Sequence, residues 1–409
     1  NLFDNFAIVL QNISMWIARK YDSTLKSLFV QFPAVVVTGA RQVGKTALVR
    51  HVFPDLNYVS LDLPAMAVQA EKNPEAFFRE HGHPLIIDEI QYAPSLFRYL
   101  KTMIDADRRP GRFILTGSQI FSLMEGISES LAGRCGMLSV MNLSADELYS
   151  FKGEKEFNEE DILFNGGYPE LHARPELDKH FWYNAYLTTY LERDVRNILN
   201  VGSLRDFDRF LRAVAARTAQ ILSYSDLARD VGVAPNTAKK WISVLQASGQ
   251  VILLEPYFRN ISKRLVKAPK LYMCDTGLAA FLMGFENWQA VERHPSVGAL
   301  WETYVIMEAF KTFASRGRNV PMWFWRTSGG DEVDLIIERN GRFTAIECKY
   351  TEVVAESSSK GLRVFTGDYG EENVTGRYIA CRTTIPYPLN DGITAIPGSR
   401  ISEYLHMGM

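Results

Sequence analysis

Residues 34–46 read AVVVTGARQVGKT, an apolar, β-branched run followed by the spacing Gly39-x-x-x-x-Gly44-Lys45-Thr46. A strand that passes directly into a glycine-containing turn and then into a helix is the context that a phosphate-binding loop requires. Gly39 and Gly44 allow the backbone to curl so that its N–H groups face the phosphates, and the helix that starts there adds its positive end. The stretch therefore predicts a nucleotide site at the end of a strand.

The same spacing gives each polar position of the loop a role. Lys45 is expected to reach the β- and γ-phosphates, and Thr46 to offer its hydroxyl to Mg²⁺, so we expect ATP and Mg²⁺ as cofactors. The predicted nucleotide-binding residues are Gly39, Ala40, Arg41, Gln42, Val43, Gly44, Lys45, Thr46 and Ala47.

The stretch HPLIIDEIQYAP places Asp88 and Glu89 at the carboxyl end of an apolar strand, the edge at which ligands of such sheets bind. Asp88 is predicted to hold Mg²⁺ through water, and Glu89 to polarise the attacking water. The alternative is that both acids only cap a helix. In RFILTGSQ, Thr116 and Ser118 end another strand, where either is a candidate sensor of the γ-phosphate or a simple turn residue.

Short β-branched runs alternate with longer amphipathic stretches throughout this first third. The strands are predicted in AVVVT, YVSLD, PLIID and RFILTG, with helices starting near Gly44, Pro64 and Pro94. This alternation is typical of an α/β fold with a parallel sheet that is covered on both faces.

The composition is that of an ordinary globular protein. The chain has 409 residues, of which 47% are hydrophobic and 22% charged, with a net charge of -2 and four scattered cysteines. Since no apolar run approaches the length of a spanning helix, we expect a cytoplasmic protein without a membrane partner. Residues 1–14 are interpreted as sequence upstream of a natural start at Met15.

The motifs GARQVGKT, DEIQ, LTGS and LAGR together resemble the AAA+ ATPases, in a branch of bacterial and archaeal ATP-binding proteins, and the resemblance covers most of the chain. It implies ATP hydrolysis, with Glu89, Lys45, Arg134 and Ser118 as the catalytic set. Arg134, and as a second candidate Arg193, would act as an arginine finger across a subunit boundary, so a homo-oligomer is expected. The alternative for either arginine is an ordinary ion pair.

The middle third has the layout of a winged helix-turn-helix. A short helix, a turn at Gly232 and a second helix opened by Pro235 are followed by two strands joined by a basic turn. From Lys239 to Lys270 there are seven basic residues and one acid, a local excess typical of phosphate binding. The predicted DNA-binding residues are Lys239, Lys240, Arg259, Lys263 and Arg264, and the alternative is packing against a protein neighbour.

The last third carries Glu302 on a helix, Asp334 in an apolar strand and Glu347-Cys348-Lys349 on the strand after an Asn-Gly turn. In this order the four side chains Glu302, Asp334, Glu347 and Lys349 resemble the signature of the PD-(D/E)xK nuclease-like fold. The resemblance implies Mg²⁺ on Asp334 and Glu347, with Lys349 beside the attacking water. The alternatives are a salt-bridged strand pair without metal or a fold kept for binding.

The resulting interpretation is an AAA+ ATPase that engages DNA through its winged helix and its C-terminal domain. The fold class is α/β, with a P-loop parallel sheet, a helical and winged-helix part and a mixed PD-(D/E)xK-like part. Two alternatives stay open, namely a regulatory switch that acts on a protein partner and an ATP-dependent nuclease. The expected domains are an N-terminal extension at residues 1–15, the ATPase core at 16–163, the lid and winged helix at 164–285, and the nuclease-like domain at 286–409.

Overall fold

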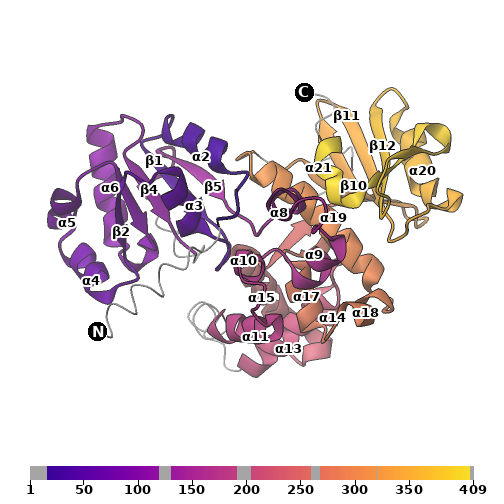
Figure 1. Ribbon diagram of the computed structural model, residues 1–409, viewed down its shortest axis with the longest axis horizontal. Coiled ribbons are helices and arrows are strands. Elements are labelled where there is room, and N and C mark those ends of the chain that lie inside the picture. The colour runs from indigo at the N-terminus through magenta and orange to yellow at the C-terminus, as the bar shows by residue number, and fades with distance from the viewer. Residues whose placement is uncertain (1–15, 119–129, 191–203, 259–267, 319, 406–409) are drawn as a thin grey trace.

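The computed structural model describes residues 16–118, 130–190, 204–258, 268–318 and 320–405. A parallel sheet with its helices lies at one end of the molecule, a mixed sheet lies at the other end, and a largely helical part lies between them (Figure 1). This is the predicted α/β fold class. The candidates Arg193, Arg259, Lys263 and Arg264, like residues 1–14, lie outside the described residues.

The first sheet has five parallel strands in the order β2-β3-β4-β1-β5. The strands are β1 (Ala34–Thr38), β2 (Asn57–Ser60), β3 (Leu85–Asp88), β4 (Phe113–Thr116) and β5 (Cys135–Ser139). All residues of β1, β3 and β4 are buried, as expected of strands covered by helices on both faces. Strand β5 was not predicted, because its exposed Met137 and Ser139 alternate with Gly136 and Leu138 instead of forming an apolar run.

Helices cover this sheet on both sides (Figure 1). They are α2 (Asp22–Phe29), α3 (Lys45–Val52), α4 (Pro64–Lys72), α5 (Pro74–His81), the short η1 (Ile90–Tyr92) and α6 (Ser95–Ala106). Helices α3, α4 and α6 begin where the sequence predicted them, at Gly44, Pro64 and Pro94.

The middle part consists of helices around a small antiparallel sheet of order β6-β8-β7. Its helices are α8 (Ala145–Lys152), α9 (Glu159–Asn165), α10 (Pro169–Ala173), α11 (Lys179–Tyr190), α13 (Leu204–Ala215), α14 (Tyr224–Val231), α15 (Pro235–Ala247), α17 (Thr276–Leu282) and α18 (Trp288–Glu292). Its strands are β6 (Gln220–Ile221), β7 (Val251–Leu254) and β8 (Lys270–Met273). The helix pair α14 and α15 and the strands β7 and β8 form where the sequence predicted them.

The C-terminal part starts with a long helix and continues as a six-stranded sheet of order β13-β14-β12-β11-β10-β9. Its helices are α19 (Val297–Ala314), η3 (Glu356–Ser359), α20 (Lys360–Tyr369), η4 (Asn390–Gly392), η5 (Gly398–Arg400) and α21 (Ile401–Tyr404). Its strands are β9 (Met322–Arg326), β10 (Glu332–Arg339), β11 (Arg342–Cys348), β12 (Val374–Cys381), β13 (Tyr387–Pro388) and β14 (Thr394–Pro397). Strands β10 and β11 pair antiparallel through the predicted Asn-Gly turn, and β12 joins β11 in parallel.

One hydrophobic core continues from the ATPase sheet into the middle part. It contains Val35 and Val37 of β1 together with Phe210 of α13, Leu227 of α14 and Trp241 of α15. The side chains of these segments therefore share one apolar interior, although more than 150 residues separate them in sequence.

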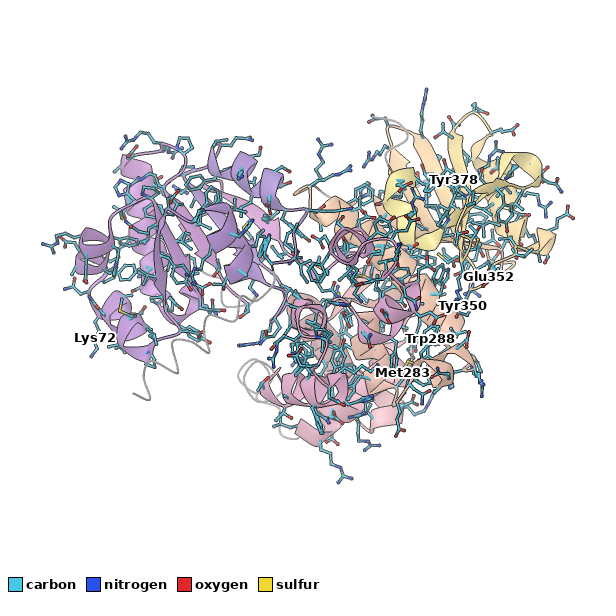
Figure 2. All side chains as sticks on the ribbon, viewed as in Figure 1. Lys72, Met283, Trp288, Tyr350, Glu352 and Tyr378 are labelled. Carbon is cyan, nitrogen blue, oxygen red and sulfur yellow. The ribbon has the colours of Figure 1, made fainter. Side chains whose placement is uncertain are left out.

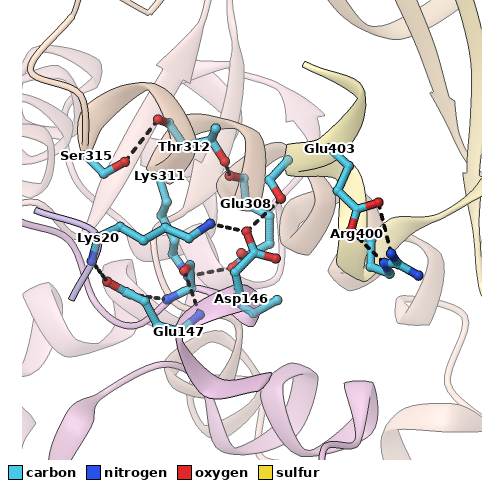
Figure 3. A network of polar contacts seen from close by, with 12 residues as sticks. Lys20, Asp146, Glu147, Glu308, Lys311, Thr312, Ser315, Arg400 and Glu403 are labelled. Carbon is cyan, nitrogen blue, oxygen red and sulfur yellow. Dashed lines mark hydrogen bonds and ion pairs between the residues drawn. The ribbon is translucent and has the colours of Figure 1, made fainter. Parts of the chain in front are cut away.

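A buried polar network joins helix α8 to helix α19 (Figure 3). The Glu308 carboxylate accepts from the backbone N–H of Ala145 at 2.8 Å and from Lys311 Nζ at 2.9 Å. Lys311 Nζ also donates to the carbonyl of Leu143 at 2.8 Å, and Ser402 donates to Asp146 at 2.6 Å. These bonds attach the C-terminal part to the chain that leaves the ATPase sheet.

None of the described helices has the length and apolar character required to span a membrane.

Candidate functional site

The loop between β1 and α3 has positive φ angles at Gly39, Gln42 and Gly44. Gly39 has φ of 146°, and a Cβ placed there would lie 2.1 Å from the carbonyl oxygen of Val140. Gly44 has φ of 88° and caps the N-terminus of α3 in the left-handed region. Because the loop turns tightly at both glycines, its N–H groups and the start of α3 face the same side.

Lys45 and Thr46 occupy the first turn of α3 with their polar groups directed to different partners. The buried Lys45 Nζ donates to the loop carbonyls of Gly39 at 3.1 Å and Ala40 at 2.7 Å. Thr46 Oγ1 donates to Asp88 Oδ1 at 2.9 Å. The hydroxyl and the carboxylate predicted to hold Mg²⁺ are thus adjacent.

Asp88 ends β3 and is almost fully buried, so its carboxylate depends on hydrogen bonds. Besides Thr46, it accepts from the hydroxyl of Thr116 and, at 2.8 Å, from that of Tyr58. Burial and the bond to Asp88 raise the pKa of Tyr58 to about 12, so the phenol keeps its proton and donates it.

Glu89 has the left-handed backbone conformation, with φ of 57°. Its N–H donates to Thr116 Oγ1 at 3.3 Å, and its carboxylate accepts from Ser118 Oγ at 3.2 Å and from the Gln91 amide. A strained residue at the end of a strand, held by neighbouring side chains, is typical of a functional position. Glu89 is the N-cap residue of the short helix η1, but its side chain makes no capping hydrogen bond there, and the roles assigned to Asp88 and Glu89 stay predictions.

A cavity of ≈ 640 Å³ lies over the loop, lined by Lys45, Thr46, Glu89 and Ser118 among others. Its opposite wall is helix α11, which contributes Trp182, Ala185, Tyr186 and Thr189. The indole of Trp182 and the ring of Tyr186 are stacked, with centroids 5.3 Å apart and planes within 9°. This aromatic wall was not predicted, since an aromatic-rich helix is equally typical of an ordinary core.

Arg19 holds the phosphate-binding loop in place by hydrogen bonds. The sequence did not single out this residue. Its buried guanidinium donates to the carbonyl of Val43 at 2.7 Å, to that of Met141 at 2.6 Å and to Glu147 at 3.1 Å. Glu147 also forms a capping box with Ser144 at the start of α8. Arg19 thereby fixes the phosphate-binding loop to the junction between β5 and α8.

The turn after helix α15 contacts the same loop. A Cβ added at Gly249 would lie 3.4 Å from Ala40, which shows how closely the two backbones approach. The amide of Gln250 donates to the hydroxyl of Tyr186 at 2.9 Å, and Tyr168 bonds to that hydroxyl at 3.0 Å. The turn that follows α15 therefore contacts both the phosphate-binding loop and the wall of the cavity.

Arg134 lies just before β5 and does not line the cavity. Its guanidinium forms a two-point ion pair with Asp105 of α6, with Nε to Oδ1 at 2.8 Å and Nη2 to Oδ2 at 2.9 Å. The structure thus shows the ordinary ion pair within one chain, and the role across a subunit boundary stays a prediction.

Helix α15 has one buried face and one exposed face. Ala238, Trp241 and Leu245 are buried, whereas Lys239 and Lys240 are exposed. A contribution of Lys270 to the basic surface was expected, and that expectation is wrong. Lys270 is buried and ion-paired with carboxylates of the C-terminal part.

The four candidate residues of the C-terminal part come from α19, β10 and the end of β11. Asp334 Oδ2 accepts from the N–H of Cys348 at 2.9 Å, and Lys349 Nζ donates to Glu347 Oε1 at 2.8 Å. Glu302 of α19 and Asp334 are joined through Lys270 Nζ, at 2.7 Å and 3.2 Å. The predicted order of helix, strand and hairpin thus brings Glu302 and Asp334 together.

Burial dominates the electrostatics of this cluster. Burial, reinforced by the Asp334 carboxylate, raises the pKa of Glu302 to about 7 and that of Glu347 to about 8. Burial opposes the charge of Lys270, but Asp334, Glu302 and Glu332 outweigh it and raise its pKa. No group of three or more His, Cys, Asp or Glu side chains suited to a metal ion is found within the described ranges.

Comparison with protein families divides the chain into three matches. Residues 31–149 match the AAA domain, 157–289 match the domain of unknown function DUF8612, and 297–401 match the domain of unknown function DUF4143. The N-terminal third is therefore an AAA-type ATPase domain, as the resemblance in sequence predicted.

The uncharacterized protein Rv2008c of Mycobacterium tuberculosis and the uncharacterized protein Mb2031c of Mycobacterium bovis are each 31% identical to this chain over 397 residues. The matched region covers 95% of this chain and 86% of each relative. The chain belongs to the family of these two proteins.

Two solved structures share part of the architecture. The Walker-type ATPase of Pyrococcus abyssi matches 65% of this chain and 96% of its own, with 17% identity and a TM-score of 0.45. A signal transduction ATPase with a tetratricopeptide repeat sensor from Pyrococcus horikoshii matches 73% of this chain and 47% of its own, with 14% identity and a TM-score of 0.29.

Proposed function

We propose that this protein binds Mg²⁺-ATP in the cavity above residues 39–47 and hydrolyses it. The observation that carries the proposal is the convergence of Lys45, the Thr46–Asp88 pair and the Glu89–Ser118 pair on one cavity at the carboxyl edge of a parallel sheet. Each of these side chains has the chemistry that its position in phosphoryl transfer requires.

The loop N–H groups and the start of α3 receive the phosphate oxygens, and Lys45 exchanges its bonds to the loop carbonyls for bonds to the phosphates. When bound, Mg²⁺ would neutralise charge that develops on the phosphates during transfer. Thr46 and Asp88 are the residues that would hold it, one directly and one through water. Glu89 orients and activates the attacking water, while Ser118 fixes the position of its carboxylate.

Two substitutions separate binding from hydrolysis. Lys45→Ala should weaken ATP binding by at least ~10-fold, because a charged hydrogen-bond donor to the phosphates is lost. Glu89→Gln should still bind ATP but lower the hydrolysis rate by ~10²–10⁴-fold, the usual contribution of general-base catalysis. Glu75→Gln, the same chemical change at an exposed position of α5, serves as the control. Equal hydrolysis rates in Glu89→Gln and the wild type would remove Glu89 from the mechanism.

We further propose that helix α15 engages DNA. Lys239 and Lys240 are exposed on its outer face. The turn that follows α15 contacts the phosphate-binding loop, so a change in the bound nucleotide can be transmitted to this helix. Such a helix contributes mainly phosphate contacts, which release counterions and make binding sensitive to salt.

The test is the dependence of DNA affinity on salt concentration, measured on duplex, forked, junction and single-stranded DNA. Replacing Lys239 and Lys240 by Ala should lower the slope of log K against log salt by up to ~0.9 for each lost phosphate contact. Lys72→Ala is the control, since this exposed lysine lies on α4 at the far end of the ATPase core (Figure 2). If no DNA of the panel binds, the alternative of a regulatory switch that acts on a protein partner replaces the DNA proposal.

The proposed oligomer depends on Arg134, which in a ring would leave Asp105 and reach the nucleotide of the neighbouring subunit. Arg134→Ala should then lower ATP hydrolysis without lowering ATP affinity. Asp105→Asn, which breaks the same ion pair but keeps the arginine, should leave hydrolysis intact. Equal losses in both variants would assign Arg134 to structure alone.

An ATP-dependent nuclease is the second candidate, favoured by the proximity of Glu302 to Asp334 and of Lys349 to Glu347. In such an enzyme Asp334 and Glu347 would hold Mg²⁺, and Lys349 would position the attacking water. Mg²⁺-dependent DNA cleavage that is lost in Lys349→Ala but retained in Lys45→Ala would establish it. Absence of cleavage on the whole DNA panel would exclude it.

A further inference from the structure

Strand β8 of the middle part places the amine of Lys270 among carboxylates of the C-terminal part. Glu302, Glu332, Asp334 and the neighbouring Glu347 are called the acidic cluster below. Lys270 Nζ lies 2.7 Å from Glu302 Oε1 and 3.2 Å from Asp334 Oδ1, and it also pairs with Glu332. The side chain of Lys270 is only 5% exposed, so its charge is balanced by these three carboxylates and not by solvent. Two residues along the same strand, the hydroxyl of Tyr272 donates to Glu302 Oε1 at 2.7 Å.

A neighbouring oxygen shows that the cluster has further capacity for a cation. Glu347 is 8% exposed, and its Oε1 accepts from Lys349. Its Oε2 is buried and has no hydrogen-bond partner among the residues that the structure describes. An unpartnered carboxylate oxygen in the interior carries a large desolvation cost, and a positive ligand would offset it. Asp334 and Glu302 act electrostatically on Glu347, so the orphan oxygen belongs to the same acidic environment.

We propose that Lys270 is the resident cation of this cluster and excludes a divalent cation from it while β8 is docked. The ammonium bonds to Glu302 Oε1 and Asp334 Oδ1, the same hard oxygens that a magnesium or manganese ion would need. These oxygens cannot bind the Lys270 ammonium group and a divalent cation at the same time. Withdrawal of Lys270 opens a divalent-cation site formed by Glu302, Asp334 and the orphan oxygen of Glu347.

The position of Lys270 in the fold indicates which movement would remove it from the carboxylates. Strand β8 is the central strand of the three-stranded sheet and pairs with β7, which follows helix α15. The turn that joins α15 to β7 contacts Ala40 of the phosphate-binding loop. Displacement of this sheet relative to α19 and β10 is therefore the movement that removes Lys270 from the carboxylates. The inference does not depend on ATP hydrolysis, because it concerns only which cation the cluster holds.

The experiment is a titration of the nucleotide-free full-length chain with Mn²⁺, followed by calorimetry and by the electron paramagnetic resonance signal of the free ion. Lys270→Met alone would leave three carboxylates without their cation, of which Asp334 is buried and Glu302 and Glu332 are half-buried, so it is combined with Glu332→Gln. This double variant keeps the net charge of the cluster, and it should bind one equivalent of Mn²⁺ more than the wild type, at least ~10-fold more tightly than any wild-type site at the cluster. Adding Asp334→Asn should abolish that equivalent.

The matched control removes a different Lys–Glu pair, which is buried and lies on helix α19. Lys311 and Glu308 are as deeply buried as Lys270 and are bonded at 2.9 Å, so Lys311→Met with Glu308→Gln reproduces the loss of packing and charge. This variant should bind no additional Mn²⁺. Any Mn²⁺ held near Asp88 is common to all these proteins and cancels in the comparison.

Two results would overturn the proposal. One is a folded Lys270→Met/Glu332→Gln protein, by far-ultraviolet circular dichroism, that binds no more Mn²⁺ than the wild type. The other is a wild-type protein that, with Lys270 in place, binds one equivalent of Mn²⁺ and loses this binding in Asp334→Asn. The second result is obtained from proteins that retain Lys270, so it decides the question even if the double variant does not fold, and Lys270→Gln then replaces the double variant in the titration.

Discussion

Replacing Arg19 by Met should destabilise the ATPase part far more than an ordinary charge removal. The guanidinium has three buried acceptors, namely the carbonyls of Val43 and Met141 and the carboxylate of Glu147. In Arg19→Met, both carbonyls lose a charged donor, and the buried Glu147 carboxylate loses its positive partner, although it keeps bonds from two backbone N–H groups. Substitution by Met retains most of the side-chain volume, so the effect reports on the polar contacts.

The magnitude follows from the buried ion pair. Breaking such a pair by removing one partner costs about 3–5 kcal/mol, and the orphaned carbonyls keep the cost in the upper part of this range. For a cooperative unit of about 150–250 residues, 1 kcal/mol shifts the melting temperature by about 2–4 °C, so a cost of about 4–5 kcal/mol lowers it by about 8–20 °C. ATP affinity should fall as well, because the carbonyl of Val43 is no longer held in place.

The assay is thermal unfolding by differential scanning calorimetry, with ATP affinity measured on the same samples. Lys20→Met is the matched control, since the neighbouring Lys20 pairs with Asp146 while 38% of its side chain remains exposed. An exposed pair of this kind contributes about 0–1 kcal/mol, which corresponds to at most about 4 °C. If Arg19→Met melts within 4 °C of Lys20→Met, the bracing role assigned to Arg19 is refuted.

Three further predictions concern the loop, the acidic cluster and the aromatic wall. Gly39→Ala should abolish ATP binding in a fluorescent-nucleotide assay, because the new Cβ would lie 2.1 Å from the carbonyl oxygen of Val140; unchanged affinity would show that the loop can rearrange. The folded state holds the Glu347 proton up to a pKa of about 8, above the ordinary value of 4.5, so the free energy of unfolding falls as pH rises between these values. Glu347→Gln should flatten this decline in melting temperature, and a parallel decline in both proteins would count against it. Trp182→Ala should weaken ATP binding whereas Phe181→Ala, at a neighbouring position that is 77% exposed, should not; equal effects would exclude the indole from the nucleotide site.

The parts that the sequence predicted are those whose signal is local. The loop at residues 39–46 combines fixed spacing with a strand on one side and a helix on the other, and both acids of the DEIQ motif follow a continuous apolar run. The Asn-Gly turn likewise fixes the register of β10 and β11, so the positions of Asp334 and Glu347 followed from the alternation of side chains.

The parts that could not be predicted depend on partners that are distant in sequence. Arg19 contacts a carbonyl 24 residues away and a carboxylate 128 residues away, and no short pattern encodes either contact. Lys270 was counted with the basic residues of the middle part because sequence shows charge but not burial. Its acceptors, Glu302 and Asp334, lie 32 and 64 residues further along the chain.

The hydrophobic core shared by β1, α13, α14 and α15 limits how this protein can be divided. A fragment that ends near residue 163 keeps the phosphate-binding loop and the acids at the end of β3. It loses the middle-part residues of the core that also contains Val35 and Val37, the aromatic wall of the cavity and the turn that touches Ala40. Such a fragment would expose core surface and tend to aggregate. The ATPase domain is thus not a transplantable module, and insertions or deletions in the middle part will affect nucleotide handling even when they leave residues 34–46 untouched.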